Sequence, residues 1–390
     1  MLDIDWRPPT HRGRPSFIRP TFEQWIEQKA EPRGYGCLSR PVQTRFHRNG
    51  FDWDMRGTLF EPAHGAAAKT GFVLLHGGAG SEMEFVETPD GRPGLAPVLA
   101  SEGFRTLALS FPGHLPKAGM WQQTVRARDP CYLLDENLPS AEVARRNIVC
   151  TFNTIVQGAV DLVDTHFDGD DVILFGHSTG GPMSVSLGQA LKRANAIGIV
   201  GWGSAGPDGW YREWLDAYGV KAEENKPIGL VARRTAASFR QAGYEDDHDL
   251  TPWGDAEDYF RWADNYKAQF KTCLCDNQHG GSVERLVDYE GVTGLPRLEF
   301  VDHLFDPDPD YLRRISVLLL TGAKDRNHWN HGAADHQRLE HFMARKFAQR
   351  TARTTLVVVP RFGHFGFVGK ANHLIAHHWI DALKGGFFQI

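Results

Sequence analysis

Six short runs of apolar residues recur along the chain, and each is followed within two residues by glycine or proline. They occupy residues 71–75, 104–110, 172–175, 196–202, 315–320 and 354–359. A strand buried on both faces of a sheet shows such a continuous run, whereas a half-exposed strand alternates apolar and polar residues. The pattern therefore predicts six buried strands of a largely parallel sheet.

Apolar residues at helical spacing lie between these runs. Residues 141–167 show the pattern of a long amphipathic helix, and residues 182–194 predict a shorter helix after the third run. Strands that alternate with helices form a mostly parallel sheet that is covered by helices on both faces. The predicted fold class is therefore α/β.

Three stretches fall outside this alternation. Residues 42–48 and 51–62 are extended in character, and Asn-Gly at 49–50 between them predicts a hairpin. Residues 1–40 are rich in proline and arginine and are interpreted as an amino-terminal arm that packs on the main body. From 207 to 310 the strand pattern disappears and tryptophan, tyrosine and charged residues accumulate, which predicts a mostly helical insertion.

Composition narrows the class of protein. Hydrophobic residues make up 41% of the 390 residues and charged residues 23%, as is ordinary for a soluble globular protein. The net charge of −5, without a long run of one sign, gives no electrostatic reason to expect a nucleic acid partner. The amino terminus lacks the apolar core of a signal peptide, and no window approaches the length of a membrane span. A cytoplasmic protein with no membrane partner is expected.

Cysteine, histidine and aspartate spacing predicts neither a disulfide framework nor a metal centre. The five cysteines include no C-x-x-C pair, and the histidines between 328 and 341 do not form H-E-x-x-H. The acidic stretch 306–310 contains prolines and lacks the glycine of an EF-hand loop, which favours a rigid solvated loop. No metal or organic cofactor is expected.

The main functional signal is the stretch Gly176-His177-Ser178-Thr179-Gly180. It matches G-x-S-x-G, follows the third apolar run and precedes a predicted helix, as the motif requires. A serine on a sharp strand-to-helix turn has strained backbone geometry, and flanking glycines keep neighbouring side chains from colliding with the strand and helix. The hydroxyl is then exposed at the carboxyl edge of the sheet, so Ser178 is the candidate nucleophile.

The motif in this setting resembles the α/β-hydrolase family, in which serine, acid and histidine follow one another along the chain. The resemblance covers residues 41–206 and 311–384. It implies that Asp325, in a Gly-x-x-Asp setting after the fifth run, is the acid, and that His364, after the sixth run, is the base. Asp208, after the fourth run, stays open as the alternative acid, because some members of the family take their acid from that position.

The same resemblance implies two backbone donors for an oxyanion. The sequence LLHGGAGSE follows the first apolar run and resembles the family's His-Gly-Gly loop, so the first donor is the amide of Gly78, with Ala79 as a further candidate. The second donor is the amide of Thr179, immediately after the serine. His76 in this loop is interpreted as a structural hydrogen-bonding residue. The loop lacks the lysine of a phosphate-binding P-loop.

The resemblance implies an α/β-hydrolase core of residues 41–206 and 311–390, with 207–310 as a helical lid near the serine. The expected reaction is hydrolysis of a small, largely apolar carboxylic ester or lactone through an acyl-enzyme. An amidase, a peptidase or a carbon–carbon bond hydrolase could use the same residues, and a non-catalytic ligand receptor could retain them. The arm and the carboxyl-terminal GGFFQI could mediate a homodimer.

Overall fold

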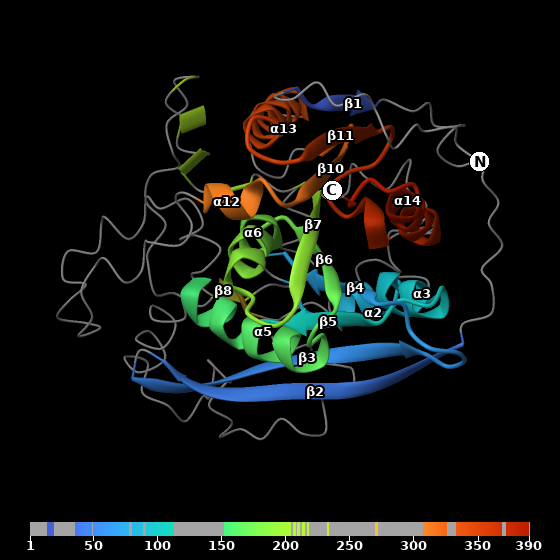
Figure 1. Cartoon of the computed structure of the whole chain (residues 1–390). Helices are drawn as coiled ribbons and strands as arrows, with labels where there is room; N and C mark the ends of the chain where they lie inside the picture. The colour runs from blue at the N-terminus through green and yellow to red at the C-terminus, as the bar shows by residue number, and fades with distance from the viewer. Residues whose placement is uncertain are drawn as a thin grey trace.

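The computed structural model describes residues 14–18, 36–48, 50–77, 80–88, 91–112, 152–203, 307–325, 333–368 and 372–389, with 206–207, 209–210, 213–214, 217, 232–233 and 270–271. Within these residues, nine strands form one sheet in the order β1-β11-β10-β7-β6-β4-β5-β3-β2 (Figure 1). Neighbours run parallel from β1 across to β5, and the pairs β5–β3 and β3–β2 are antiparallel. The predicted α/β class with a mostly parallel sheet is confirmed.

The six apolar runs form the parallel centre of this sheet, as predicted. They correspond to β4 (Thr70–Leu75), β5 (Thr106–Ser110), β6 (Asp171–His177), β7 (Asn195–Trp202), β10 (Ser316–Gly322) and β11 (Arg353–Val359). The remaining strands of the sheet are β1 (Ser16–Ile18), β2 (Cys37–Arg48) and β3 (Phe51–Pro62). Because the central strands are parallel, their carboxyl ends meet at one edge of the sheet.

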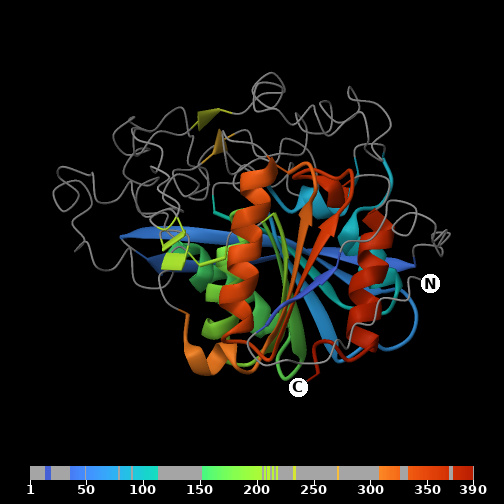
Figure 2. The ribbon, with the colours of Figure 1, turned by 90° about the horizontal axis from the view of Figure 1, so that it is seen from above.

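Helices cover both faces of the sheet. One face packs against α5 (Phe152–His166), α6 (Gly180–Ala190), α12 (Pro309–Leu312) and α13 (Ala333–Ala348). The other face packs against α2 (Met83–Val86), α3 (Leu95–Ser101), the 3-10 helix η4 (Gly366–Val368) and α14 (Asn372–Lys384). Figure 2 shows the strands between α13, in orange, and α14, in red.

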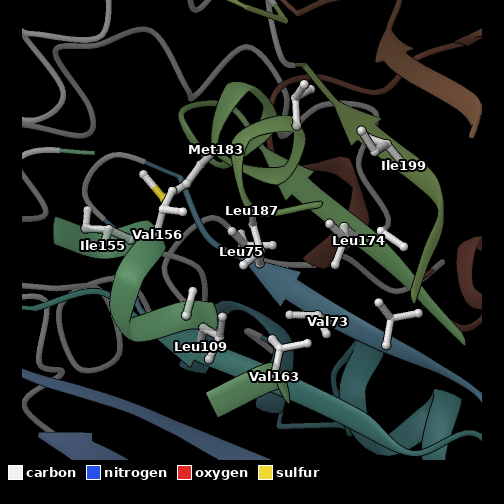
Figure 3. Packing of buried hydrophobic residues seen from close by; sticks show 14 of the residues in the cluster. Val73, Leu75, Leu109, Ile155, Val156, Val163, Leu174, Met183, Leu187 and Ile199 are labelled. Atoms are coloured by element: carbon white, nitrogen blue, oxygen red, sulfur yellow. The ribbon is translucent and has the colours of Figure 1, made fainter. Parts of the chain in front are cut away.

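Alternate residues of each central strand enter opposite cores. In β4, Val73 belongs to the cluster under α5 and α6, whereas Phe72 and Leu74 belong to the cluster under α3 and α14. Figure 3 shows the first cluster, where Val73 meets Val163 of α5 and strand neighbours such as Leu174. Both faces of the strand are therefore apolar, which is why the sequence shows continuous runs instead of alternation.

The predicted hairpin is formed by β2 and β3, at the edge of the sheet opposite β1. β2 and β3 pair antiparallel from Cys37–Pro62 to Arg48–Phe51, and Gly50 in the turn has φ of 78°. Glycine adopts this conformation without the steric cost that a Cβ would bring. β3 also pairs with β5, so the hairpin extends the sheet beyond its parallel part.

Three predictions fall only partly within the described residues. The predicted helix 141–167 is seen as α5 from Phe152 onward, and its first part lies outside the described residues. Of the predicted arm, Ser16–Ile18 form β1, which pairs with β11 at the edge of the sheet. Within 207–310, the described residues include a two-stranded ladder of β8 (Ala232–Arg233) and β9 (Phe270–Lys271), and the helical lid stays a prediction. No helix among the described residues is long and apolar enough to cross a membrane.

Candidate active site

Ser178 occupies a strained turn between β6, which ends at His177, and α6, which begins at Gly180. Its φ is 51°, in the left-handed region that non-glycine residues seldom adopt. The Ser178 amide donates to the carbonyl oxygen of Trp202 in β7 at 3.0 Å, and its own carbonyl accepts from the amide of Gly181 at 2.9 Å. Hydrogen bonds to two neighbouring elements therefore hold the strain in place.

The flanking glycines of the motif are required by close backbone approach. A Cβ added at Gly176 would lie 2.3 Å from the carbonyl oxygen of Gly180. A Cβ added at Gly180 would lie 2.3 Å from the carbonyl oxygen of Leu75, at the end of β4. Both distances are far inside van der Waals contact, so any larger residue would push α6 away from the strands. The spacing of the two glycines in the motif thus follows from the close packing of the turn between β6 and α6.

The predicted acid and base lie side by side. Asp325 follows β10, His364 follows β11, and Nδ1–H of His364 donates to Oδ2 of Asp325 at 2.9 Å. Both side chains are buried. With the Nδ1 proton directed at the carboxylate, Nε2 of a neutral imidazole carries the lone pair that accepts a proton. The ring of His364 also lies 4.6 Å, between centroids, from the ring of His177, which immediately precedes Ser178.

Backbone contacts join the acid loop, which follows β10 and ends at Asp325, to the end of β11 and to the base loop, which follows β11 and contains His364. The amide of Lys324 donates to the carbonyl oxygen of Phe362 at 2.9 Å, and the amide of Ala323 donates to that of Val359 at 2.8 Å. A Cβ at Gly322, the last residue of β10, would lie 2.1 Å from the Phe362 oxygen. The glycine of the Gly-x-x-Asp pattern therefore lets the two loops approach closely enough for the carboxylate to reach the imidazole.

Gly203 was not singled out by the sequence, yet its backbone packs on the acid–base pair. It follows β7 with φ of 56°, and its amide donates to the carbonyl oxygen of Leu320 at 3.0 Å. A Cβ there would lie 2.5 Å from Oδ2 of Asp325 and 2.8 Å from Nδ1 of His364. The only available signal was a glycine directly after a predicted strand, which is too common to identify a site.

Replacing Gly203 by alanine should lower kcat by about tenfold to a hundredfold, because displacement of a catalytic group by a fraction of an ångström to one ångström has effects of this order. The matched control is Gly169→Ala. Gly169 also has positive φ, at 75°, but a Cβ there meets nothing within 4 Å. Steady-state kinetics of both variants separates the steric effect from the backbone cost. Equal activities of the two variants would contradict the assignment of Gly203.

His76 ties the loop that follows β4 to the residue that follows β5. Its ring lies 3.8 Å, between centroids, from the ring of Phe111, and the side chain is fully buried. Nε2 accepts from the amide of Phe111 at 3.1 Å, so in a neutral ring the proton lies on Nδ1, which donates to the carbonyl oxygen of Gly77 at 2.7 Å. His76 therefore holds the loop and has no ring nitrogen left for acid–base chemistry.

The oxyanion donors are only partly described. Thr179 is the N-cap residue of α6, with φ of −55° and ψ of −29°, and is buried next to Ser178. Gly78 and the further candidate Ala79 lie outside the described residues, as does the alternative acid Asp208. Their roles stay predictions. Among the residues that the structure describes, no group of three histidine, cysteine, aspartate or glutamate side chains is placed to hold a metal ion.

Two buried carboxyl groups with different surroundings lie at the start of α2, where Glu82 is the N-cap residue and Glu84 lies in the first turn. Burial raises the pKa of Glu82 to about 7, against weaker opposing effects of its own backbone amide and of the Arg56 guanidinium. Glu84, two residues further on, contacts His177, with Oε2 3.0 Å from Nδ1. The sequence analysis identified neither residue. No motif marks Glu84, because its partner His177 lies 93 positions away in the chain.

The family model described as the alpha/beta hydrolase family matches residues 72–378, well over half of the chain. The chain therefore belongs to the alpha/beta hydrolase family, as the resemblance implied. The matched range includes Ser178, Asp325 and His364 and extends from β4 into α14. No curated protein matches the sequence.

Solved structures that resemble the chain are distant from it. A probable hydrolytic enzyme from Pseudomonas aeruginosa PAO1 is 18% identical, with a TM-score of 0.47 over 88% of this chain and 94% of that one. The thioesterase domain from the curacin biosynthetic pathway is 11% identical, with a TM-score of 0.45 over 87% and 99%. Brefeldin A esterase, a bacterial homologue of human hormone-sensitive lipase, is 13% identical, with a TM-score of 0.42 over 92% and 78%.

Proposed function

We propose that the protein is a serine hydrolase that cleaves a carboxylic ester or lactone of a small, largely apolar molecule. The observation that carries the proposal is the buried Asp325–His364 hydrogen bond next to the strained turn of Ser178. A carboxylate–imidazole pair beside a serine held at positive φ is the arrangement that activates a hydroxyl for attack. Membership in the alpha/beta hydrolase family makes hydrolysis the expected class of reaction.

Acylation begins when Oγ of Ser178 attacks the carbonyl carbon of the ester while Nε2 of His364 takes the hydroxyl proton. The resulting imidazolium is stabilised by the Asp325 carboxylate at 2.9 Å. The amides of Gly78 and Thr179 hold the negative oxygen of the tetrahedral intermediate. The bond from carbon to the alcohol oxygen then breaks, the imidazolium gives its proton to that oxygen, and the acyl group stays on Ser178.

Deacylation repeats these steps with water. His364 takes one proton of a water molecule while the water oxygen attacks the acyl carbon. The bond between the acyl carbon and Oγ of Ser178 then breaks, and the imidazolium returns the proton to Oγ. The products are one acid and one alcohol, or one hydroxy acid from a lactone. The proposal includes residues 207–310 as a lid, some of whose aromatic side chains line an apolar cavity.

The experiment that tests this reaction is a substrate panel followed by mass detection of the acyl-enzyme. Short-chain p-nitrophenyl esters, small lactones and matched anilides are offered at equal concentration, and the reaction is quenched with acid during turnover. We expect hydrolysis of esters or lactones and an acyl mass on the peptide that contains Ser178. Faster hydrolysis of the anilides, or turnover with the acyl mass on another residue, would contradict the proposal.

A further inference from the structure

We propose that Glu84 and His177 form a buried positioning pair for the catalytic histidine, which deepens the proposed function and rests on it. Nδ1 of His177 lies 3.0 Å from Oε2 of Glu84, and its Nε2 lies 3.1 Å from the backbone carbonyl oxygen of His364. The side chain of His177 is 1% exposed and that of Glu84 is fully buried. The pair thus connects α2, the end of β6 next to the nucleophile turn, and the loop that carries His364.

The two partners of the His177 ring, the Glu84 carboxyl group and the His364 carbonyl oxygen, fix the position of one ring proton. A backbone carbonyl oxygen only accepts, so Nε2 of His177 must carry the hydrogen that is directed at His364. Nδ1 faces a carboxyl group, which completes the arrangement in either of two ways: as a carboxylate beside an imidazolium, or as a carboxylic acid that donates to a neutral ring. In both cases the Nε2–H donor is the same and is directed at the carbonyl oxygen of His364, while Glu84 is the partner of Nδ1.

The surroundings are shaped to admit this pair. A Cβ at Gly80 would lie 2.3 Å from Oε1 of Glu84, and one at Gly77 would lie 2.8 Å from Nδ1 of His177. The amide of Gly77 also points at Oε2 of Glu84, at 3.5 Å. Gly77 and Gly80, both in the segment between β4 and α2, are therefore needed to make room for the pair, in addition to any part this segment plays in holding an oxyanion.

Aromatic contacts complete the support of the base loop. The ring of His177 lies 4.6 Å from the ring of His364, 4.8 Å from that of Phe365 and 4.7 Å from that of Phe367, between centroids. The variable position of G-x-S-x-G thus touches both the side chain and the backbone of the base. Since the motif itself requires no histidine there, the contact with His364 accounts for this residue in this chain.

Variants of His177 separate its donor from its shape. In His177→Gln the side-chain amide can reach the place of Nε2–H and donate to the His364 carbonyl oxygen, whereas His177→Phe keeps a ring without a donor. We expect kcat per titrated active site to fall by about a hundredfold in His177→Phe with KM little changed, because only the placement of the base is altered. His177→Gln should recover most of this loss. Equal defects in both variants, or wild-type turnover by His177→Phe, would overturn the proposal.

Glu84→Leu tests the other member of the pair, with Glu82→Leu as the matched control. Both carboxyls are buried at the start of α2, Glu82 as its N-cap residue, but of the two Glu84 is the one that contacts His177. We expect Glu84→Leu to lower kcat per active site in the manner of His177→Phe, and Glu82→Leu to retain wild-type kcat. The rate at which a fluorophosphonate phosphonylates Ser178, with loss of fluoride, gives a second readout that needs no ester substrate. Equal rates in the two variants would contradict a role for Glu84.

A measurement on the wild-type protein covers the case in which a variant does not fold. Nitrogen-15 NMR of labelled histidines, with the His177 signals assigned through the nuclear Overhauser contacts of its ring with the rings of Phe365 and Phe367, reports which ring nitrogen carries a proton. We expect Nε2 of His177 to be protonated in the folded protein, and an unprotonated Nε2 would overturn the pair. The proposed function fails separately, if the wild type neither hydrolyses esters nor reacts with the fluorophosphonate.

Discussion

Replacing Ser178 by alanine should lower kcat for ester hydrolysis by about a million-fold, the effect seen when the nucleophile of a serine–histidine–aspartate set is removed. Alanine lacks the oxygen that forms the acyl-enzyme, so only residual stabilisation by the site remains. The fold should be retained, because both hydrogen bonds that hold the turn use the backbone of residue 178. Hydrolysis of p-nitrophenyl acetate and thermal unfolding of the same sample measure the two effects.

Ser101→Ala is the control for this variant. Its hydroxyl donates to the carbonyl oxygen of Val98 at 2.8 Å, at the end of α3, so the substitution removes a serine hydroxyl without touching the site. It should keep wild-type kcat. His364→Ala should lose activity to a similar extent as Ser178→Ala, since the two act as a unit. A Ser178→Ala enzyme that retains wild-type turnover would place the nucleophile elsewhere.

The parallel sheet could be predicted from the sequence because burial on both faces removes polar residues from a strand. β4 illustrates this: Phe72 and Val73 are adjacent in the chain, enter opposite cores, and are both fully buried. Six such runs at the spacing of strand–helix units leave few alternatives to an α/β fold. By contrast, β1 has three residues and pairs only at the edge, so no apolar pattern of its own marks it.

The Asp325–His364 pair could also be anticipated, because the ends of parallel strands meet at one edge and the family's residue order identifies which ends to compare. The residues around the pair could not. Gly203 matters through the absence of a side chain, and Glu84, in α2, matters through a partner at the end of β6. Neither property leaves a local pattern, since both depend on which segments the fold brings together.

Replacing Asp325 by asparagine should lower kcat by about ten-thousand-fold with little change in KM, as expected when the orienting carboxylate of such a set becomes an amide. The amide is close in size to the carboxyl, so packing against Gly203 is kept. Its nitrogen can donate to Nδ1 of His364, which favours the tautomer with the proton on Nε2 and leaves no lone pair to accept the serine proton. Asp208→Asn is the matched variant for the acid that the sequence left open, and it should retain wild-type kcat. Steady-state kinetics of the two variants decides the assignment. The hydrogen bond between His364 and Asp325 leads us to expect the loss in Asp325→Asn. A loss of kcat confined to Asp208→Asn would make Asp208 the acid.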